Sequence, residues 1–242
     1  MTPETIERLH MLGVDPQDLR PFFSSCLSCV LFLDKGRLSW RSEPGAPRLV
    51  VDFLHGRWRR RAAGHVRNER LIKAVFGRHK TSDGPLRVVD ATAGLGGDSF
   101  LMALAGAEVL AFERHLVVHA LLADGLWRAR QNPELAEAVN RIRLRAGDCL
   151  QQKPFPAGKV IYLDPMFPSR RKSAQVKKNM QALHRLVGVG QHDADRLLLS
   201  ALRQSVAKVV VKRPRLAAPL AGKQPASQVV GKTNRFDVYI PE

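Results

Sequence analysis

A short turn carries the side chains best suited to chemistry on a planar amine. It reads Asp164-Pro-Met-Phe-Pro168 and follows the apolar run Val160–Leu163. Its two prolines stiffen the chain because each fixes its own φ angle. Phe167 can stack on a base held out of its helix, and Asp164 can accept hydrogen bonds from an exocyclic amine. Because such a site works mainly by positioning, we expect Asp164, Pro165 and Phe167 to be its catalytic part.

A glycine-containing turn, Asp90-Ala-Thr-Ala-Gly94-Leu-Gly96-Gly97-Asp98, indicates a second part of the site. Gly94 and Gly96 allow a tight turn and a close approach of the backbone to a ligand. Glu113 ends the next predicted strand, where its carboxylate can accept both hydroxyls of a ribose. The spacing therefore predicts a cofactor that contains a nucleoside.

Charge near this turn favours one cofactor over another. Ser99 stands where the dinucleotide pattern G-x-G-x-x-G needs a third glycine or an alanine. Asp98 would also repel a pyrophosphate at the helix N-terminus. S-adenosylmethionine carries a sulfonium and an amino group and no phosphate, so Asp90 and Asp98 suit it. The motif lacks the Gly-Lys-Ser/Thr ending of a P-loop. We expect S-adenosylmethionine rather than NAD, with a turn that binds no ligand as the alternative.

The elements that must position these residues alternate between strands and helices. The expected strands are Val88-Val89, Glu108–Phe112, Arg141–Arg145, Val160–Leu163 and Val206–Val211, with helices at Phe100–Leu104, Val117–Arg130 and Ala194–Ser205 and a hairpin of Val229-Val230 and Phe236–Ile240. Such alternation predicts a parallel sheet, and ligands bind outside the carboxyl ends of its strands. Asp90, Glu113, Asp148 and Asp164 follow four strand ends, so they should converge on one crevice.

The N-terminal part of the chain has a different pattern. Cys29–Leu33 and Arg37–Trp40 predict a hairpin, Leu49–Phe53 predicts another strand, and Glu69–Phe76 predicts an amphipathic helix. We expect a small β-containing region over residues 1–55 and the main α/β domain over residues 56–242.

The balance of charges indicates the class of partner. The 242 residues carry a formal net charge of +17, which favours a polyanion, with nucleic acid ahead of an anionic membrane surface. A basic amphipathic helix and a lipidation signal are not evident, so no membrane partner is expected. The N-terminus lacks an apolar signal core and no 18-residue apolar stretch occurs, so the expected location is cytoplasmic.

Basic residues follow the Asp-Pro turn closely. No Asp or Glu occurs from Pro165 to His192, and lysine and arginine there can bind phosphates without reading sequence. We expect RNA to contact Arg170, Arg171, Lys172, Lys177 and Lys178.

His115 and His119 are four residues apart on a predicted helix, but no third ligand accompanies them, so no metal is expected.

These residues together resemble the Asp-Pro-Pro-Tyr/Phe motif of class I amino-group methyltransferases. The chain is more specifically similar to the ribosomal RNA small subunit methyltransferase J family, over about residues 49–240. Met166 within the Asp-Pro motif makes this likeness specific. The segments that carry it are Val89-Asp-Ala-Thr-Ala-Gly-Leu-Gly96, Tyr162-Leu-Asp-Pro-Met-Phe-Pro168, Lys177-Lys178, Val210-Val-Lys-Arg-Pro214 and Arg235-Phe-Asp-Val-Tyr239.

The resemblance implies an α/β fold of the class I (Rossmann-like) methyltransferase type. Its sheet would be mostly parallel and seven-stranded, with a C-terminal antiparallel hairpin, and residues 56–242 would be the methyltransferase domain. The resemblance also implies methyl transfer from S-adenosylmethionine to the exocyclic amine (N2) of a guanine in small-subunit (16S) ribosomal RNA. The partner would be that RNA or the small ribosomal subunit.

The site residues combine the glycine turn with what the resemblance implies. Gly97-Asp98, Glu113-Arg114 and Asp164 match family motifs, and Asp148 is placed by its position after the third strand. Gly97 stands where an arginine is expected, and Gly147-Asp148 replaces a small hydroxyl-bearing pair. The expected cofactor contacts are Asp90, Gly94, Gly96, Gly97, Asp98, Glu113, Arg114, Asp148 and Asp164.

Three other functions remain open at this point. A DNA adenine or cytosine amino-methyltransferase uses a similar turn, but the chain offers little room for a separate recognition domain. A non-catalytic RNA-binding or ribosome-assembly protein could keep the fold, although the intact Asp164 turn and Gly94 and Gly96 argue against it. An NAD-dependent oxidoreductase would need a proton-transfer pair, and none is evident.

Overall fold

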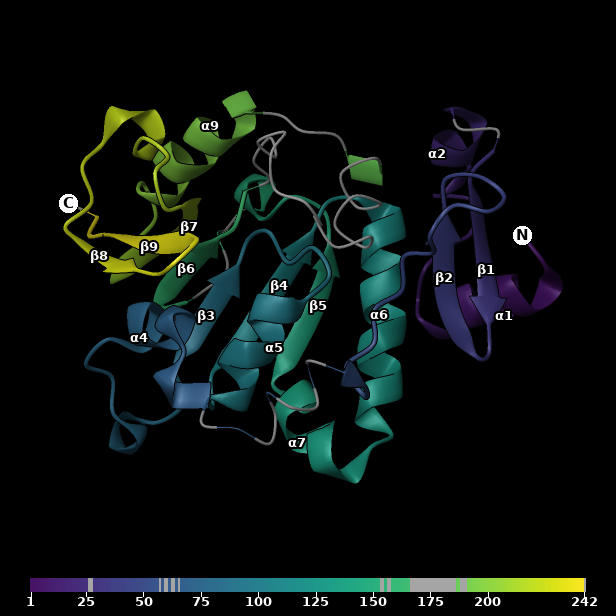
Figure 1. Cartoon of the computed structure of the whole chain (residues 1–242), viewed down its shortest axis with the longest axis horizontal. Coiled ribbons are helices and arrows are strands. Elements are labelled where there is room, and N and C mark those ends of the chain that lie inside the picture. The colour runs from purple at the N-terminus through teal and green to yellow at the C-terminus, as the bar shows by residue number, and fades with distance from the viewer. Residues whose placement is uncertain are drawn as a thin grey trace.

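The computed structural model describes the chain apart from residues 26–27, 57, 59–60, 62–63, 65, 153–154, 156–157, 166–185, 188–190 and 242. At its centre is a seven-stranded sheet with the order β5-β4-β3-β6-β7-β9-β8 (Figure 1). Its strands are β3 (Arg87–Asp90), β4 (Glu108–Glu113), β5 (Ile142–Ala146), β6 (Val160–Leu163), β7 (Lys208–Pro214), β8 (Ser227–Val230) and β9 (Asn234–Tyr239).

Six of the seven described strands of this sheet point in the same direction, and β9 of the C-terminal hairpin runs against them. β3 pairs with β4 on one side and with β6 on the other, while β9 is antiparallel to both β7 and β8. The strand order reverses between β3 and β6, so the topological switch point lies at the ends of these two strands. The Rossmann-like class I architecture expected from the sequence is therefore confirmed.

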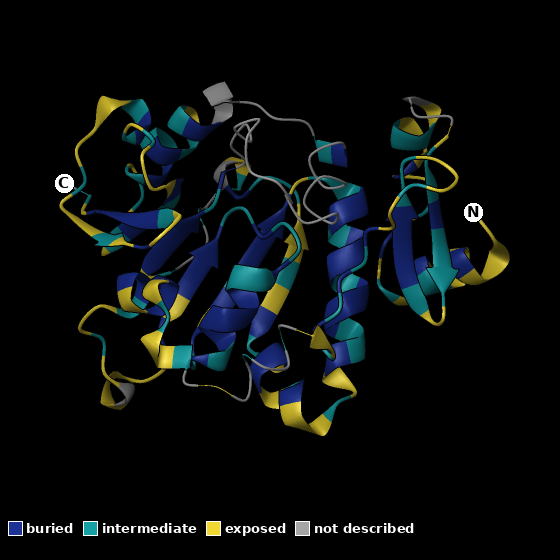
Figure 2. Cartoon of the chain, in the orientation of Figure 1, coloured by how far each residue is buried: buried dark blue, intermediate teal, exposed yellow. Residues whose placement is uncertain are grey.

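Helices cover both faces of the sheet because its strands are apolar on both sides. Val88, Val160 and Tyr162 belong to a buried cluster shared with α4 (Arg70–Phe76), α5 (Gly97–Leu104) and α6 (Leu116–Arg130). Val89 and Ile161 point the other way and pack with α9 (Gln191–Ala201). The central strands are accordingly buried along their length (Figure 2).

One expectation about local structure was wrong. Leu49–Phe53 does not form a strand, because its only ladder contact is the isolated bridge between Leu49 and Trp40. The predicted helix Val117–Arg130 is confirmed as α6 (Leu116–Arg130), and a further helix that was not predicted, α7 (Pro133–Asn140), begins at the proline that follows it. Asn132 caps this helix by accepting from the backbone N–H of Glu134, and a proline is well tolerated in the first helical turn.

The described residues also form short 3-10 helices, which are η1 (Val66–Asn68), η2 (Thr81–Asp83), η3 (Cys149–Gln151) and η4 (Leu220–Gly222).

The N-terminal region lies beside α6, on the side away from the C-terminal hairpin (Figure 1). It consists of α1 (Pro3–Met11), α2 (Arg20–Ser25) and the antiparallel hairpin of β1 (Val30–Asp34) and β2 (Arg37–Arg41). The predicted hairpin is thus confirmed, and two helices accompany it. The boundary at residue 55 stays a prediction.

A buried carboxylate joins this region to α6. Asp124 of α6 is fully buried. It accepts hydrogen bonds from the guanidinium of Arg8 in α1 at 2.5 Å, from Arg128 at 2.8 Å and from the backbone N–H of Leu38 in β2 at 3.0 Å. Three donors from three elements therefore satisfy one buried charge.

The helices of the described residues are all too short or too polar to span a membrane.

Candidate functional site

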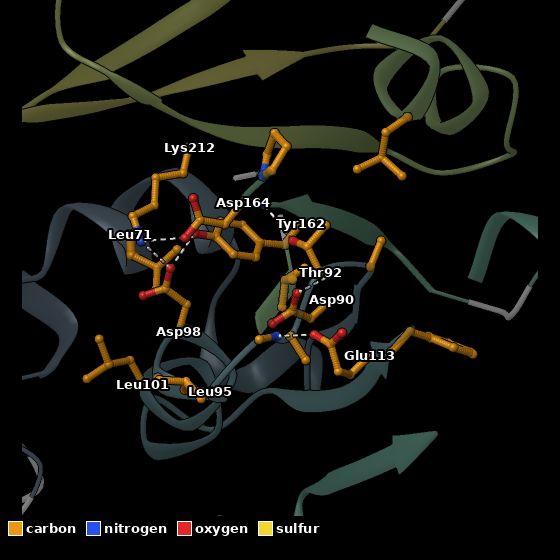
Figure 3. A pocket seen from close by; sticks show the side chains of 18 of the residues that line it. Leu71, Asp90, Thr92, Leu95, Asp98, Leu101, Glu113, Tyr162, Asp164 and Lys212 are labelled. Carbon is orange, nitrogen blue, oxygen red and sulfur yellow. Dashed lines mark hydrogen bonds and ion pairs between the residues drawn. The ribbon is translucent and has the colours of Figure 1, made fainter. Parts of the chain in front are cut away.

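The carboxyl ends of the parallel strands open onto a cavity of about 1210 Å³ (Figure 3). Most of the expected site residues line it: Asp90, Gly94, Gly97, Asp98, Glu113, Arg114, Asp148, Asp164 and Pro165. The strand-end residues thus meet at one place, as the topology requires. Phe167, Arg170, Arg171, Lys172, Lys177 and Lys178 lie outside the described residues.

Gly96 does not line the cavity. It caps the N-terminus of α5 with a φ of 73°, which a residue with a side chain rarely adopts. A Cβ at Gly96 would also collide with the side chain of Leu122 on α6. Gly96 therefore serves the close packing of the turn against α6, and its predicted contact with the cofactor has no support from this geometry.

Asp90 stabilises the conformation of the glycine turn through two hydrogen bonds. Its carboxylate accepts a hydrogen bond from the backbone N–H of Thr92 at 3.1 Å and another from the hydroxyl of Ser99 at 2.5 Å. Burial raises the pKa of Asp90 to about 7, from an ordinary value of 3.8. With both oxygens engaged and only 1% of its surface exposed, Asp90 acts chiefly on the turn that faces the cavity.

Glu113 links the ends of two neighbouring strands. Its carboxylate accepts hydrogen bonds from the backbone N–H of Gly94 at 2.8 Å and from that of His115 at 2.7 Å. Burial raises the pKa of Glu113, and these two hydrogen bonds work against that rise. Each carboxylate oxygen keeps a second lone pair. The group can therefore still accept the two hydroxyls of a ribose in the cavity.

The glycine at position 97 is explained by an aromatic ring. A Cβ on Gly97 would lie 2.5 Å from Cη2 of Trp58 and 2.6 Å from its Cζ2. Trp58 also contacts Phe53 and Phe100, with ring centroids 6.1 Å apart in each case. The ring thus occupies the space that an arginine at position 97 would need. Trp58 is therefore part of the cavity wall.

The Asp-Pro turn joins a polar cluster that sequence reasoning did not assemble. Asp164 donates its backbone N–H to the hydroxyl of Thr92 at 2.6 Å, and its Oδ2 lies 2.7 Å from Nζ of Lys212. The same Nζ lies 2.7 Å from Oδ2 of Asp98, which also accepts from the hydroxyl of Tyr162 at 2.6 Å (Figure 3).

Tyr162 and Lys212 were missed although both lay within quoted motifs. Their place follows from the register of the sheet, which the sequence does not give and in which Leu163 of β6 pairs with Val211 of β7. The next residues along these parallel strands are Asp164 and Lys212, so they are neighbours at the same edge.

The far wall of the cavity comes from the end of β5. Gly147 has a φ of 103° and donates its N–H to the carbonyl oxygen of Glu113 at 2.9 Å. This turns the chain so that Asp148 lines the cavity, as does Arg114 from the end of β4. The expected placement of Asp148 after the third strand is therefore what the structure has.

The polar groups that line the cavity fit S-adenosylmethionine. Glu113 offers acceptors for a ribose, and Asp98 and Asp164 place carboxylates where a ligand with a sulfonium and an ammonium group gains attraction. Among the described residues, no group of three or more His, Cys, Asp or Glu side chains could hold a metal ion.

Comparison with known proteins agrees with this site. Residues 23–241 match the SAM_MT family of SAM-dependent methyltransferases. The chain is 47% identical over 204 residues to a ribosomal RNA small subunit methyltransferase J from Hahella chejuensis, covering 84% of this chain and 75% of that protein. It is 43% identical over 239 residues to the protein of the same name from Marinobacter nauticus, covering 96% and 83%.

A solved structure is also similar along most of its length. The SAM-dependent methyltransferase from Neisseria gonorrhoeae superimposes with a TM-score of 0.68 at 37% identity, covering 88% of this chain and 83% of that one. The chain uses S-adenosylmethionine as its methyl donor and belongs to the ribosomal RNA small subunit methyltransferase J family of SAM-dependent methyltransferases.

Proposed function

We propose that this enzyme methylates the exocyclic N2 amine of a guanine in small-subunit ribosomal RNA. The observation that carries the proposal is the position of Asp164. Its side chain is 34% exposed and lines the same cavity as Gly94 and Glu113. A hydrogen-bond acceptor therefore stands beside the cofactor-binding turn, where an amine would have to be held. The shared name of the relatives supports small-subunit ribosomal RNA as the substrate.

The chain's own residues supply the positioning that this reaction needs. The cofactor, when bound, supplies a methyl group made electrophilic by its sulfonium. Glu113 holds the ribose end of the cavity, and the carboxylates of Asp98 and Asp164 attract the cationic end. Asp164 accepts a hydrogen bond from the target amine, which turns the nitrogen lone pair toward the methyl group. Pro165 fixes the backbone that follows Asp164.

The remaining site assignments are part of the same proposal. Asp90, Gly97, Arg114 and Asp148 would contribute to the cofactor-binding wall, and Phe167 would stack on the base. The RNA would follow the basic segment Arg170, Arg171, Lys172, Lys177 and Lys178. Arg70 and Arg196 already line the described cavity from α4 and α9, so a polyanion meets positive charge at its mouth. The cytoplasmic location stays a prediction.

The proposal is tested by offering the enzyme competing nucleic acids. Purified protein and labelled S-adenosylmethionine are incubated with small ribosomal subunits from a strain that lacks this gene, with naked small-subunit RNA, and with duplex DNA. We expect label in the ribosomal RNA and none in the DNA. Label in the DNA alone would support a DNA amino-methyltransferase. Cofactor binding without transfer to any of these would favour the non-catalytic assembly protein.

A further inference from the structure

Lys212 lies where the cofactor wall and the catalytic turn meet. It follows the buried run Val209–Val211 of β7, and its side chain is 27% exposed. Its Nζ is 2.7 Å from an oxygen of Asp98 on α5 and 2.7 Å from an oxygen of Asp164 after β6 (Figure 3). One ammonium therefore joins two carboxylates that belong to different parts of the site.

These carboxylates would repel each other without a cation between them. Asp90, Asp98 and Asp164 all lie at this edge of the sheet, and each of the other two charges raises the pKa of Asp90. Burial raises the pKa of Asp164, Asp98 raises it further, and Lys212 opposes both. Among the described residues, the hydroxyl of Tyr162 also faces this pair, since it is hydrogen-bonded to Asp98 and feels the charge of Asp164, and Arg196 lines the same cavity from α9.

Lys212 itself is held in its charged form. Burial alone would lower its pKa, but the charges of Asp164 and Asp98 outweigh burial and raise the pKa above its usual range. An ammonium held at 2.7 Å from each of two carboxylates favours its protonated form, which is poorly suited to accept a proton from the target amine. Its charge and its three N–H donors are what it can contribute.

We propose that Lys212 is a positioning residue that keeps the Asp164 carboxylate ionised and aimed at the target amine; this inference rests on the proposed function. In the reaction the amine nitrogen forms a bond to the methyl carbon while the carbon–sulfur bond breaks, and its electron pair goes to sulfur. The nitrogen then loses one proton to water. An ionised Asp164 accepts the amine's N–H throughout, whereas a protonated Asp164 offers a competing donor.

The test compares Lys212→Met, which removes the charge and keeps the length of the side chain, with Lys212→Arg, which restores the charge. The control is Lys208→Met in the same strand. Lys208 is also half-buried and donates to the carbonyl oxygen of Ala74 at 2.8 Å, at the opposite end of β7 from the cavity. The rate constant kcat is measured for each full-length protein from pH 5.5 to pH 9.

We expect Lys212→Met to move the acidic limb of the profile upward by about one pH unit, which lowers kcat on that limb by up to about tenfold. The rate should recover toward that of wild type at pH 9, where Asp164 ionises without help. Lys212→Arg and Lys208→Met should keep the wild-type limb. An unmoved limb in Lys212→Met, or the same shift in Lys208→Met, would overturn the inference.

A second readout needs no RNA and separates this inference from the proposed substrate. The carboxyl carbon of Asp164 is followed by NMR in protein with labelled aspartate, and its signal is assigned by its loss in Asp164→Asn. A higher midpoint in Lys212→Met supports the role of Lys212 even if ribosomal RNA proves not to be the substrate. If Lys212→Met does not fold, Lys212→Gln replaces it. Failure of both to fold, while Lys208→Met folds, would show a requirement for stability and overturn the inference.

Discussion

Gly94 donates its backbone N–H to Oε2 of Glu113 at 2.8 Å. This hydrogen bond joins the turn after β3 to the end of β4, and it sets the carboxylate of Glu113 before a cofactor is present. Glu113 is 7% exposed, so the group is already removed from most water. A preformed acceptor of this kind loses little freedom when a ribose binds.

Replacing Glu113 with glutamine should weaken cofactor binding. In wild type each carboxylate oxygen of Glu113 accepts from a backbone N–H, of Gly94 or of His115. In the variant an amide NH2 group replaces one of these oxygens, so one backbone N–H loses its acceptor and the ribose loses an acceptor as well. We expect the affinity for S-adenosylmethionine to fall about 10- to 100-fold, as for the loss of a charged hydrogen bond. Isothermal titration calorimetry measures this.

Glu108→Gln is the matched control for that variant. Glu108 is the exposed first residue of the same strand, at the edge away from the cavity. The affinity of the Glu108→Gln variant for the cofactor should equal that of wild type. Equal affinities for wild type and Glu113→Gln would remove Glu113 from the cofactor site.

Replacing Asp164 with alanine should abolish methyl transfer and leave RNA binding nearly intact. The variant loses the acceptor beside the amine, but phosphate contacts carry most of the affinity for RNA. Turnover is measured with labelled cofactor, and RNA affinity by filter binding. Asp18→Ala, at an exposed position of the N-terminal region, should behave as wild type. A turnover near the wild-type rate would exclude Asp164 from the mechanism.

Asp90 should make stability depend on pH. In the unfolded chain its carboxyl ionises above its ordinary pKa of 3.8, whereas in the fold it keeps its proton up to a pKa of about 7. The folded state therefore binds the extra proton between these values, and stability falls as the pH rises from about 4 to 7. This contribution is fully present below pH 4 and lost above pH 7.

Asp90→Asn tests that dependence, because the amide keeps the shape and stays neutral. Its oxygen can accept from Thr92, and its nitrogen can donate to the hydroxyl of Ser99. Relative to wild type, its free energy of unfolding should rise by about 3 kcal/mol between pH 5 and pH 8. Urea unfolding at the two pH values measures the difference. A constant difference would show that the Asp90 pKa is not raised.

Asp124 should be important for the stability of the N-terminal region. Asp124→Asn leaves the guanidinium groups of Arg8 and Arg128 without their buried partner, and such a loss costs about 3–5 kcal/mol. The comparison is Glu137→Gln, which breaks an exposed pair with Arg141 in which Glu137 is 83% exposed. That change should cost under about 0.5 kcal/mol. Similar costs for both variants in urea unfolding would contradict this role of Asp124.

Much of the sheet was predictable because its strands are short apolar runs that end in polar residues. Val88-Val89 before Asp90, and Val160–Leu163 before Asp164, gave both the strands and their carboxyl ends. Parallel topology then brought four acidic residues together without any knowledge of their contacts. The hairpin around Gly231 was predictable for the same reason, since a turn residue separates two apolar runs.

What escaped prediction depends on pairing between distant segments. Lys212 joins the site because β7 lies beside β6 in a register that one sequence does not reveal. Trp58 faces Gly97 through a segment that has no periodic pattern. Leu49–Phe53 looked like a strand because four of its five residues are apolar, yet Leu49, Val51 and Phe53 pack into the core and the segment makes one described bridge to β2. Burial and pairing give similar sequence signals, so composition alone could not separate them.

The most direct measurement identifies the atom that is methylated. Ribosomal RNA modified by the enzyme is digested to nucleosides, and the labelled product is compared by mass spectrometry and chromatography with synthetic N1-, N2- and N7-methylguanosine. We expect the label to elute with N2-methylguanosine and to come from a single site in the small-subunit RNA. Label on a ring nitrogen, or on another base, would contradict it.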